Sequence, residues 1–315
     1  MKLEDAIGTG LKVLWVVNAG GHLSEAIRLS ARIGASSDSL WVTPETSHAQ
    51  GHLAGARTRW VPYVKPRDLR GSVRTARIVR DLVAREHFDV CISTGAALAA
   101  LALPLVRIRG IRTVFVESLA RPNGFSLTGR MLNLVPGVDT LTQYRHLERR
   151  SWRFSGTILD GYSRRDLKPR SPRRIFVTLG TIRPYRFDRL VDAVLSIVEP
   201  GDHIVWQLGG TSREDLPGES HVDLSPERLR REVERADVVI THAGIGTILD
   251  VLDAGKVPLL APRMADHGEH VDAHQADITR VLTESGLALG FDLERPKREI
   301  LNSAAAVKVE RGGHQ

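Results

Sequence analysis

The sequence predicts an α/β protein built from two doubly wound, Rossmann-like domains, on three observations. Short β-branched runs alternate with amphipathic segments along almost the whole chain, which is typical of βαβ units and a parallel sheet. The 315 residues are enough for two domains of ordinary size. A polar, basic stretch with two prolines, residues 161–174, separates one βα series from a second. We therefore expect a first domain over 1–165, a linker over 166–174 and a second domain over 175–315.

Apolar runs mark the expected strands of the first half. They are LKVLWVV, SLWVTP, TRWVPYV, DVCIS, TVFVES and, from Asp139, DTLTQ. Helices are expected from about Leu23 and over 72–86.

The second half repeats this alternation. Strands are expected at RRIFVTLG, HIVWQLG, VVITHAG and VPLLAP. A helix is expected over RFDRLVDAVLSIV, and another begins at Ser225, a good N-cap followed by Pro226. Two more are expected over 246–254 and from about 269 to 284.

Composition excludes several classes of protein. The single cysteine, Cys91, lies in an apolar run and rules out a disulfide framework, so a reducing cytoplasm is the expected compartment. The first ten residues lack the apolar core of a signal peptide, and the longest apolar stretch, 96–106, is too short to span a bilayer. We expect a cytoplasmic protein that is at most peripheral on the inner face of the plasma membrane.

The net charge and the distribution of arginines suggest which partners the protein binds. Lysine and arginine exceed aspartate and glutamate by 44 − 37 = 7, and Arg70, Arg74, Arg77 and Arg80 recur at helical spacing. Such a stripe would attract anionic lipid or a diphosphate headgroup, although a solvated helix face explains it equally well. Aromatic residues make up 5% of the chain and none interleave with the basic stretch, so no nucleic-acid partner is expected.

In open α/β sheets ligands bind beyond the carboxyl ends of the strands, so the loops after the apolar runs carry the candidate residues. The first loop holds Gly20, Gly21 and His22. The glycines let a ligand approach the backbone near a helix N-terminus, and the imidazole is a candidate general base. A tight turn with an exposed histidine is the alternative.

The run RRIFVTLG ends at Gly180 and is followed by Thr181, and these two residues would meet the other domain across a cleft. A simple turn explains these two residues almost as well.

The segment THAGIGTILD has the sharpest pattern. A strand ends, two glycines make the turn, and a helix begins with unpaired amides, so a diphosphate can bind there without a metal ion. Asp250, one turn further, would accept hydrogen bonds from ribose hydroxyls, or be a solvated helix residue. The candidate diphosphate- and ribose-binding residues of this segment are His242, Gly244, Gly246, Thr247 and Asp250.

Polar residues crowd the segment 262–275. Its His270 and His274 are four apart, but the glutamate precedes the first histidine and no third ligand has an obvious spacing, so we expect no metal. Sugar hydroxyls suit the cluster better. Its candidate sugar-binding residues are Glu269, His270, Asp272 and Gln275.

The usual signatures of three other enzyme classes do not occur. The chain has no G-x-S-x-G elbow, no Walker lysine and no G-x-G-x-x-G after the first strand. Hydrolase, P-loop kinase and dinucleotide oxidoreductase hypotheses are therefore disfavoured.

These motifs converge on one family. The pieces FVTLGT, ITHAGIGTILDVLDAGKVPLLAPR and HGEHVDAHQ resemble the catalytic subunit of the eukaryotic two-subunit N-acetylglucosaminyltransferase that acts on dolichyl-diphosphate N-acetylglucosamine. NAGGHLSEA, DVCISTGAALA and VFVESLARPNGFSLTGRMLNLVPGVDTLTQ resemble its membrane-recruiting partner. The chain is also similar to bacterial exopolysaccharide and lipid II-forming transferases.

The resemblance implies a GT-B fold, with two Rossmann-like domains facing across a cleft. It also implies an inverting, metal-independent and cofactor-free transfer of N-acetylglucosamine or a related hexose. The donor would be a UDP-sugar and the acceptor a polyprenyl-diphosphate-linked or exopolysaccharide glycan. His22 would be the base, with Glu117 in reserve, and Gly20 and Gly21 would meet the acceptor. The alternatives are a UDP-sugar 2-epimerase and a non-catalytic scaffold that recruits a partner transferase to the membrane.

Overall fold

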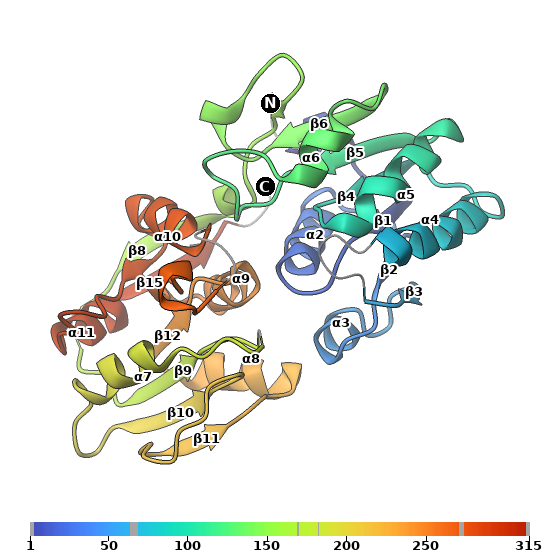
Figure 1. The fold of residues 1–315 in the computed structure, drawn as a ribbon. Coiled ribbons are helices and arrows are strands. Elements are labelled where there is room, and N and C mark those ends of the chain that lie inside the picture. The colour runs from blue at the N-terminus through green and yellow to red at the C-terminus, as the bar shows by residue number, and fades with distance from the viewer. Residues whose placement is uncertain (1–2, 64–68, 169, 182, 271–273, 313–315) are drawn as a thin grey trace. The chain divides into compact units, whose positions relative to one another are not determined.

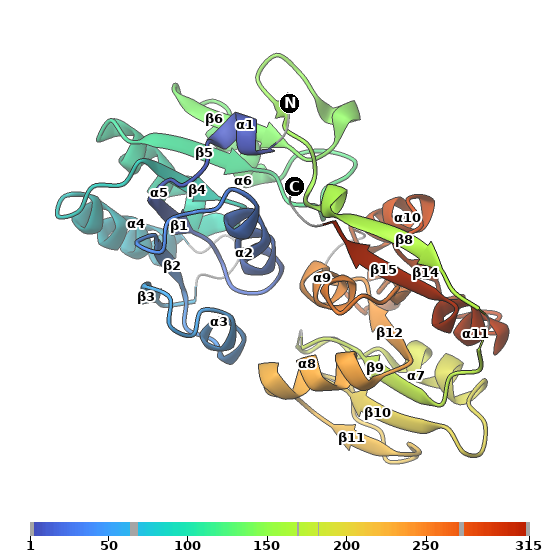
Figure 2. The same ribbon diagram turned by 180° about the vertical axis from the view of Figure 1, so that it is seen from behind.

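The computed structural model of the protein describes residues 3–63, 69–168, 170–181, 183–270 and 274–312. The chain divides into two compact units, Met1–Asp160 and Gly161–Gln315, and each is described by itself. Figure 1 labels their helices and strands, and Figure 2 gives the view from behind.

The first unit contains a seven-stranded parallel sheet in the order β3-β2-β1-β4-β5-β6-β7. Its strands are β1 (Val13–Val16), β2 (Leu40–Pro44), β3 (Thr58–Val61), β4 (Val90–Ser93), β5 (Arg112–Val116), β6 (Val138–Thr142) and β7 (Arg153–Phe154). Its helices are α1 (Leu3–Ile7), α2 (Gly21–Arg32), α3 (Ser47–His52), α4 (Leu69–Val83), α5 (Ala97–Ile108) and α6 (Leu127–Leu132).

Burial explains why the central strands form. Every residue of β1 and of β4 is buried, as expected for parallel strands covered on both faces. Leu14 of β1 pairs with Leu40 on one side and with Cys91 on the other. Cys91 is fully buried, and burial raises the pKa of its thiol well above the usual range, so the cysteine is an inert part of the core.

The second unit contains a six-stranded parallel sheet in the order β11-β10-β9-β12-β13-β14. Its strands are β9 (Arg174–Thr178), β10 (His203–Gln207), β11 (Glu219–His221), β12 (Val238–His242), β13 (Leu259–Ala261) and β14 (Leu289–Gly290). Its helices are α7 (Asp188–Leu195), α8 (Pro226–Arg235), α9 (Ile245–Asp253), α10 (His274–Glu284) and α11 (Glu299–Ala305).

The boundary between the units differs from the expected one. The strand β8 (Tyr162–Asp166) pairs antiparallel with β15 (Val307–Arg311) and so belongs to the second unit. Residues 161–165 had been expected to end the first domain, because they are polar and basic. An exposed two-stranded ribbon has this composition as readily as a linker does, because few of its side chains are buried.

Both main sheets have the doubly wound order of the Rossmann fold, so the predicted fold class is confirmed. In each main sheet the first strand along the chain lies between the second and the fourth. The sheet order therefore reverses between β1 and β4 in the first unit and between β9 and β12 in the second. Within the described residues, every helix falls short of the length and apolarity needed to cross a membrane.

Candidate functional site

The loops that follow the two reversal points carry the candidate residues. At such a point the connections on either side diverge to opposite faces of the sheet and leave a crevice beyond the strand ends. In the first unit the loops after β1 and β4 meet there. In the second unit the loops after β9 and β12 do.

His22 lies in the first turn of α2, immediately after the Gly20–Gly21 turn. Its ring packs against Gly95 in the loop after β4: a Cβ atom on Gly95 would lie 2.7 Å from His22 Cε1. Gly95 also has φ +132°, a conformation that disfavours other residues. Thr94 Oγ1 donates a 2.7 Å hydrogen bond to the His22 carbonyl oxygen. The β4 loop, absent from the sequence-based candidates, therefore fixes the orientation of His22.

The environment of His22 keeps its imidazole neutral. Burial lowers the pKa of the ring to about 4, and the positive charge of Arg121 acts in the same direction. The buried Nδ1 atom has no hydrogen-bond partner among the described residues. A neutral imidazole can accept a proton at neutral pH, which is the property a general base needs.

Glu117, the reserve candidate for the base, follows β5 and is 3% exposed. Its Oε2 atom accepts hydrogen bonds from the Ser126 amide (2.9 Å) and hydroxyl (3.1 Å), and Oε1 accepts one from the Ser118 amide (3.3 Å). Ser126 in turn caps α6 through the Gly129 amide. Because these contacts occupy both oxygens, we assign Glu117 to the support of the loop and keep His22 as the candidate base.

His242 ends β12 in the second unit and is enclosed by glycines. A Cβ atom on Gly180, which has φ +76°, would lie 2.5 Å from His242 Cε1, and one on Gly244 would collide with Nε2. Burial lowers the pKa of His242 to about 3, and the Arg263 charge adds to this effect. The ring is therefore a neutral group held between two predicted candidate loops.

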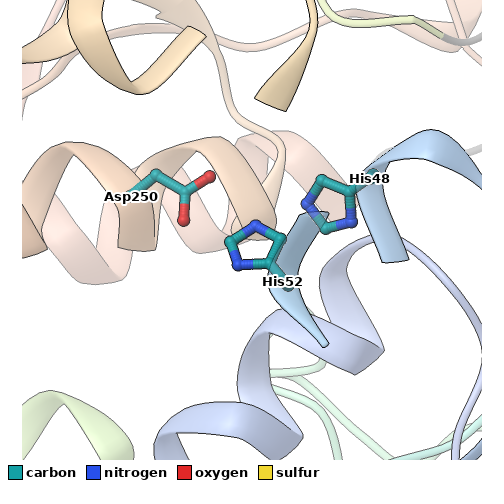
Figure 3. Close-up of side chains that lie close together, drawn as sticks. All are labelled: His48, His52 and Asp250. Atoms are coloured by element: carbon teal, nitrogen blue, oxygen red, sulfur yellow. The ribbon is translucent and has the colours of Figure 1, made fainter. Parts of the chain in front are cut away.

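The predicted diphosphate-binding residues lie at the N-terminus of α9. Gly244 is the N-cap and has no side chain to satisfy the first amides. Gly246 and Thr247 lie in the first turn, where N–H groups and the helix dipole favour an anion. Asp250 is half-buried on the next turn of the same helix (Figure 3).

Figure 3 also labels His48 and His52, which the sequence analysis did not single out. They lie one turn apart on α3 in the first unit, with ring centroids 4.4 Å apart.

Arg263 is a buried charged residue of the second unit that was absent from the sequence-based candidates. It follows β13, is fully buried, and packs over the Phe187 ring at 5.0 Å. Its guanidinium donates hydrogen bonds to the carbonyl oxygens of Leu179, Tyr185, Arg186 and Glu269. Arg263 thus connects the loop after β9 with residues 185–186 and with residue 269. Burial lowers its pKa to about 10, well above neutral pH, so the charge is retained.

The predicted sugar-binding residues of the segment 262–275 have different surroundings. Glu269 is 4% exposed and both its oxygens accept hydrogen bonds from Arg189, at 2.9 and 3.1 Å. Gln275 accepts from the Arg263 amide at 2.9 Å. His270 precedes α10, with its ring 6.3 Å from that of Tyr185, and Asp272 lies outside the described residues.

The helix expected from about residue 269 begins at His274. A 3₁₀ turn, Ala265–His267, and a left-handed Gly268 occupy the preceding residues, so His270 and His274 do not share a helix face as expected. Thr181, for its part, is exposed in the turn after β9.

Comparisons with known proteins agree with this geometry. Residues 174–289 match the model of the glycosyltransferase family 28 C-terminal domain. The solved structure of MurG from Acinetobacter baumannii superposes with a TM-score of 0.54 at 16% identity, covering 93% of this chain and 89% of that one. The glycosyltransferase SnogD from Streptomyces nogalater gives 0.55 at 17% identity, covering 94% and 93%. The chain thus shares the fold of these solved glycosyltransferases, and its second domain matches the glycosyltransferase family 28 C-terminal domain.

Two curated relatives match the chain over part of their length. The chain is 26% identical over 235 residues to the UDP-N-acetylglucosamine–N-acetylmuramyl-(pentapeptide) pyrophosphoryl-undecaprenol N-acetylglucosamine transferase of Rippkaea orientalis, over 72% of this chain and 66% of the relative. It is 30% identical over 149 residues to the UDP-N-acetylglucosamine transferase subunit ALG14 of Eremothecium gossypii, over 38% and 66%. The chain thus spans just under two thirds of the length of each.

Proposed function

We propose that the protein transfers a sugar, N-acetylglucosamine or a related hexose, from a UDP-sugar to a polyprenyl-diphosphate-linked acceptor, with inversion and without a metal ion. The observation that carries the proposal is the uncapped N-terminus of α9 beside the enclosed His242. It lies within the part of the chain that matches the family 28 domain. The two curated relatives, by their names, use UDP-N-acetylglucosamine, and one acts on a pyrophosphoryl-undecaprenol acceptor.

In this proposal the second domain binds the donor and the first binds the acceptor. His22 removes the proton from the acceptor hydroxyl, whose oxygen attacks the anomeric carbon and forms the new glycosidic bond. The bond from that carbon to the diphosphate oxygen breaks, and its electron pair leaves with UDP. The amides of the first turn of α9 and the helix dipole stabilise the departing charge, as fixed donors do in other active sites. His22 then returns its proton to water.

A UDP-release assay tests the proposal. Purified protein is incubated with each of a panel of UDP-sugars, in EDTA, with and without a polyprenyl-diphosphate-linked sugar. We expect UDP release from one donor only when acceptor is present, and a lengthened glycan of inverted anomeric configuration. Epimerised donor without acceptor would replace the proposal by a 2-epimerase, and no turnover with any donor would favour a scaffold.

We also propose a peripheral membrane surface on α5 and α6, which pack against each other in the first unit. Four large apolar side chains are exposed there, Ile108 (79%), Leu127 (59%), Met131 (47%) and Leu134 (81%). The exposed Arg109 and Arg130 flank them. The arginine stripe predicted on α4 is also exposed, at Arg70, Arg74, Arg77 and Arg80. Apolar side chains that enter the headgroup region beside cationic groups bind anionic bilayers.

Vesicle sedimentation tests this surface. Leu134→Glu is expected to weaken binding to vesicles with 30% anionic lipid about tenfold, because burying a leucine contributes roughly 1.5 kcal/mol or more. Val222→Glu in the second domain, where Val222 is 56% exposed, is the matched control and should bind like the wild type. Equal binding by all three proteins would remove this face from the proposal.

A further inference from the structure

The proposed mechanism gives no role to the buried carboxyl group of Glu25. Glu25 lies on α2, one turn after His22, and is fully buried. Among the described residues it has no ion-pair partner. Its oxygens instead accept hydrogen bonds from the Ser118 hydroxyl (2.5 Å), the Leu119 amide (3.0 Å) and the Gln143 side chain (3.0 Å). Burial raises the pKa of Glu25 to about 7, and the three converging donors oppose this rise.

Two of the three donors belong to the loop between β5 and α6, residues 117–126. Residues that follow β6 make further contacts with the same loop. Gln143 also donates to the Glu117 carbonyl at 3.0 Å, the Tyr144 hydroxyl donates to the Leu119 carbonyl, and the His146 ring contacts the Pro122 carbonyl at 2.6 Å. The loop is therefore anchored on both sides of residues 120 and 121.

Arg121 lies between these anchors. It is half-buried, and among the described residues its guanidinium group has neither a hydrogen bond nor an ion pair. Its charge nevertheless contributes to lowering the pKa of His22 and opposes the rise in the pKa of Glu117 caused by burial. Leu119, two residues before Arg121, donates to Glu25, which lies one turn after His22 on α2. The loop that carries Arg121 is thus bonded to the helix that carries the candidate base. An arginine in that situation is suited to bind a phosphate, whose oxygens match its planar fork.

We propose that Glu25 is a positioning residue: it anchors the β5–α6 loop and so holds Arg121 near His22, where the guanidinium binds a phosphate of the acceptor. The inference rests on the proposed function, because it is the acceptor that brings a diphosphate to the first domain. In this proposal Arg121 recognises the acceptor diphosphate, and Glu25 holds Arg121 in place.

Steady-state kinetics of three variants test the placement. Arg121→Gln is expected to raise the acceptor KM at least tenfold, with the donor KM unchanged, and Arg121→Lys should recover part of the loss. Glu25→Gln is expected to act in the same direction, because an amide offers one acceptor oxygen to three donors. A merely structural defect would instead lower kcat or the fraction of active protein. Arg150→Gln, an exposed arginine of the same domain, is the control and should leave both KM values unchanged.

A binding measurement separates this inference from the proposed function. Calorimetric titration with inorganic pyrophosphate, on protein saturated with UDP so that the donor site is filled, is expected to show binding that Arg121→Gln abolishes. Ser118→Ala, which removes one donor to Glu25, serves if Glu25→Gln does not fold, and should weaken pyrophosphate binding severalfold. An unchanged acceptor KM and unchanged pyrophosphate binding in Arg121→Gln would overturn the inference while transfer continues. Absence of transfer by the wild type would instead overturn the proposed function, and the titration would still decide the anion site.

Discussion

Replacing His22 by alanine is expected to lower kcat for sugar transfer by about 10²- to 10⁴-fold, the range that a positioned general base contributes. The ring lies in the first turn of α2 against Gly95, where burial and the Arg121 charge keep it neutral. The variant should bind UDP with unchanged affinity, because its donor domain is intact. Rapid-quench measurement of transfer and fluorescence titration of UDP binding would check both expectations.

The pH dependence of transfer provides a second readout for His22. With its pKa lowered to about 4, the imidazole is deprotonated at neutral pH and becomes protonated as the pH falls through about 4. The wild-type kcat should therefore stay level down to about pH 5 and then fall, and His22→Ala should lack this acid limb. His87→Ala, which alters an exposed histidine in the same domain, should keep the wild-type rate and profile. Full turnover by His22→Ala would remove the residue from the mechanism.

The predicted loops were found because each is local in sequence. An apolar strand that ends in glycine and polar residues signals a binding turn whatever its neighbours are, and this placed His22, Gly180 and Gly244 beyond strand ends. The sheet order is not local. That β1 lies beside β4, and β9 beside β12, depends on crossover connections through the helices. The contact of His22 with Gly95 follows from that order, so the sequence alone could not reveal it.

The burial of two ionisable side chains, Glu25 and Arg263, was a second feature that the sequence-based predictions did not include. Glu25 and Arg263 occur in polar stretches that read as an exposed helix face and a loop. Their burial depends on partners distant along the chain, such as Gln143 at 118 residues' separation and Leu179 at 84. A polar residue directly after VPLLAP was a usable signal for Arg263, because that position adjoins the carboxyl end of a buried strand. No comparable signal marked Glu25.

Replacing the buried Arg263 is expected to lower the stability of the second domain and to weaken donor binding. Arg263→Met keeps much of the side-chain volume over Phe187 but leaves the carbonyl oxygens of Leu179 and Glu269 without their donor. Unsatisfied buried acceptors should lower the free energy of unfolding by about 3 kcal/mol. The transition that reports the second domain should then fall by roughly 6 to 12 °C. Differential scanning calorimetry would measure the shift.

The same substitution separates a stabilising role from an organising one. Arg263 connects the loop after β9 to the carbonyl of residue 269, and that loop contains the Gly180 that packs against His242. If the guanidinium organises the donor site, Arg263→Met should weaken UDP binding at least tenfold at temperatures well below its transition, where the domain is folded. Arg295→Met, an exposed arginine of the same domain, should change neither quantity. Reduced stability with normal UDP affinity would show that Arg263 only stabilises the core. In that case the loop after β9 would bind the nucleotide without help from the guanidinium, provided that the domain is folded.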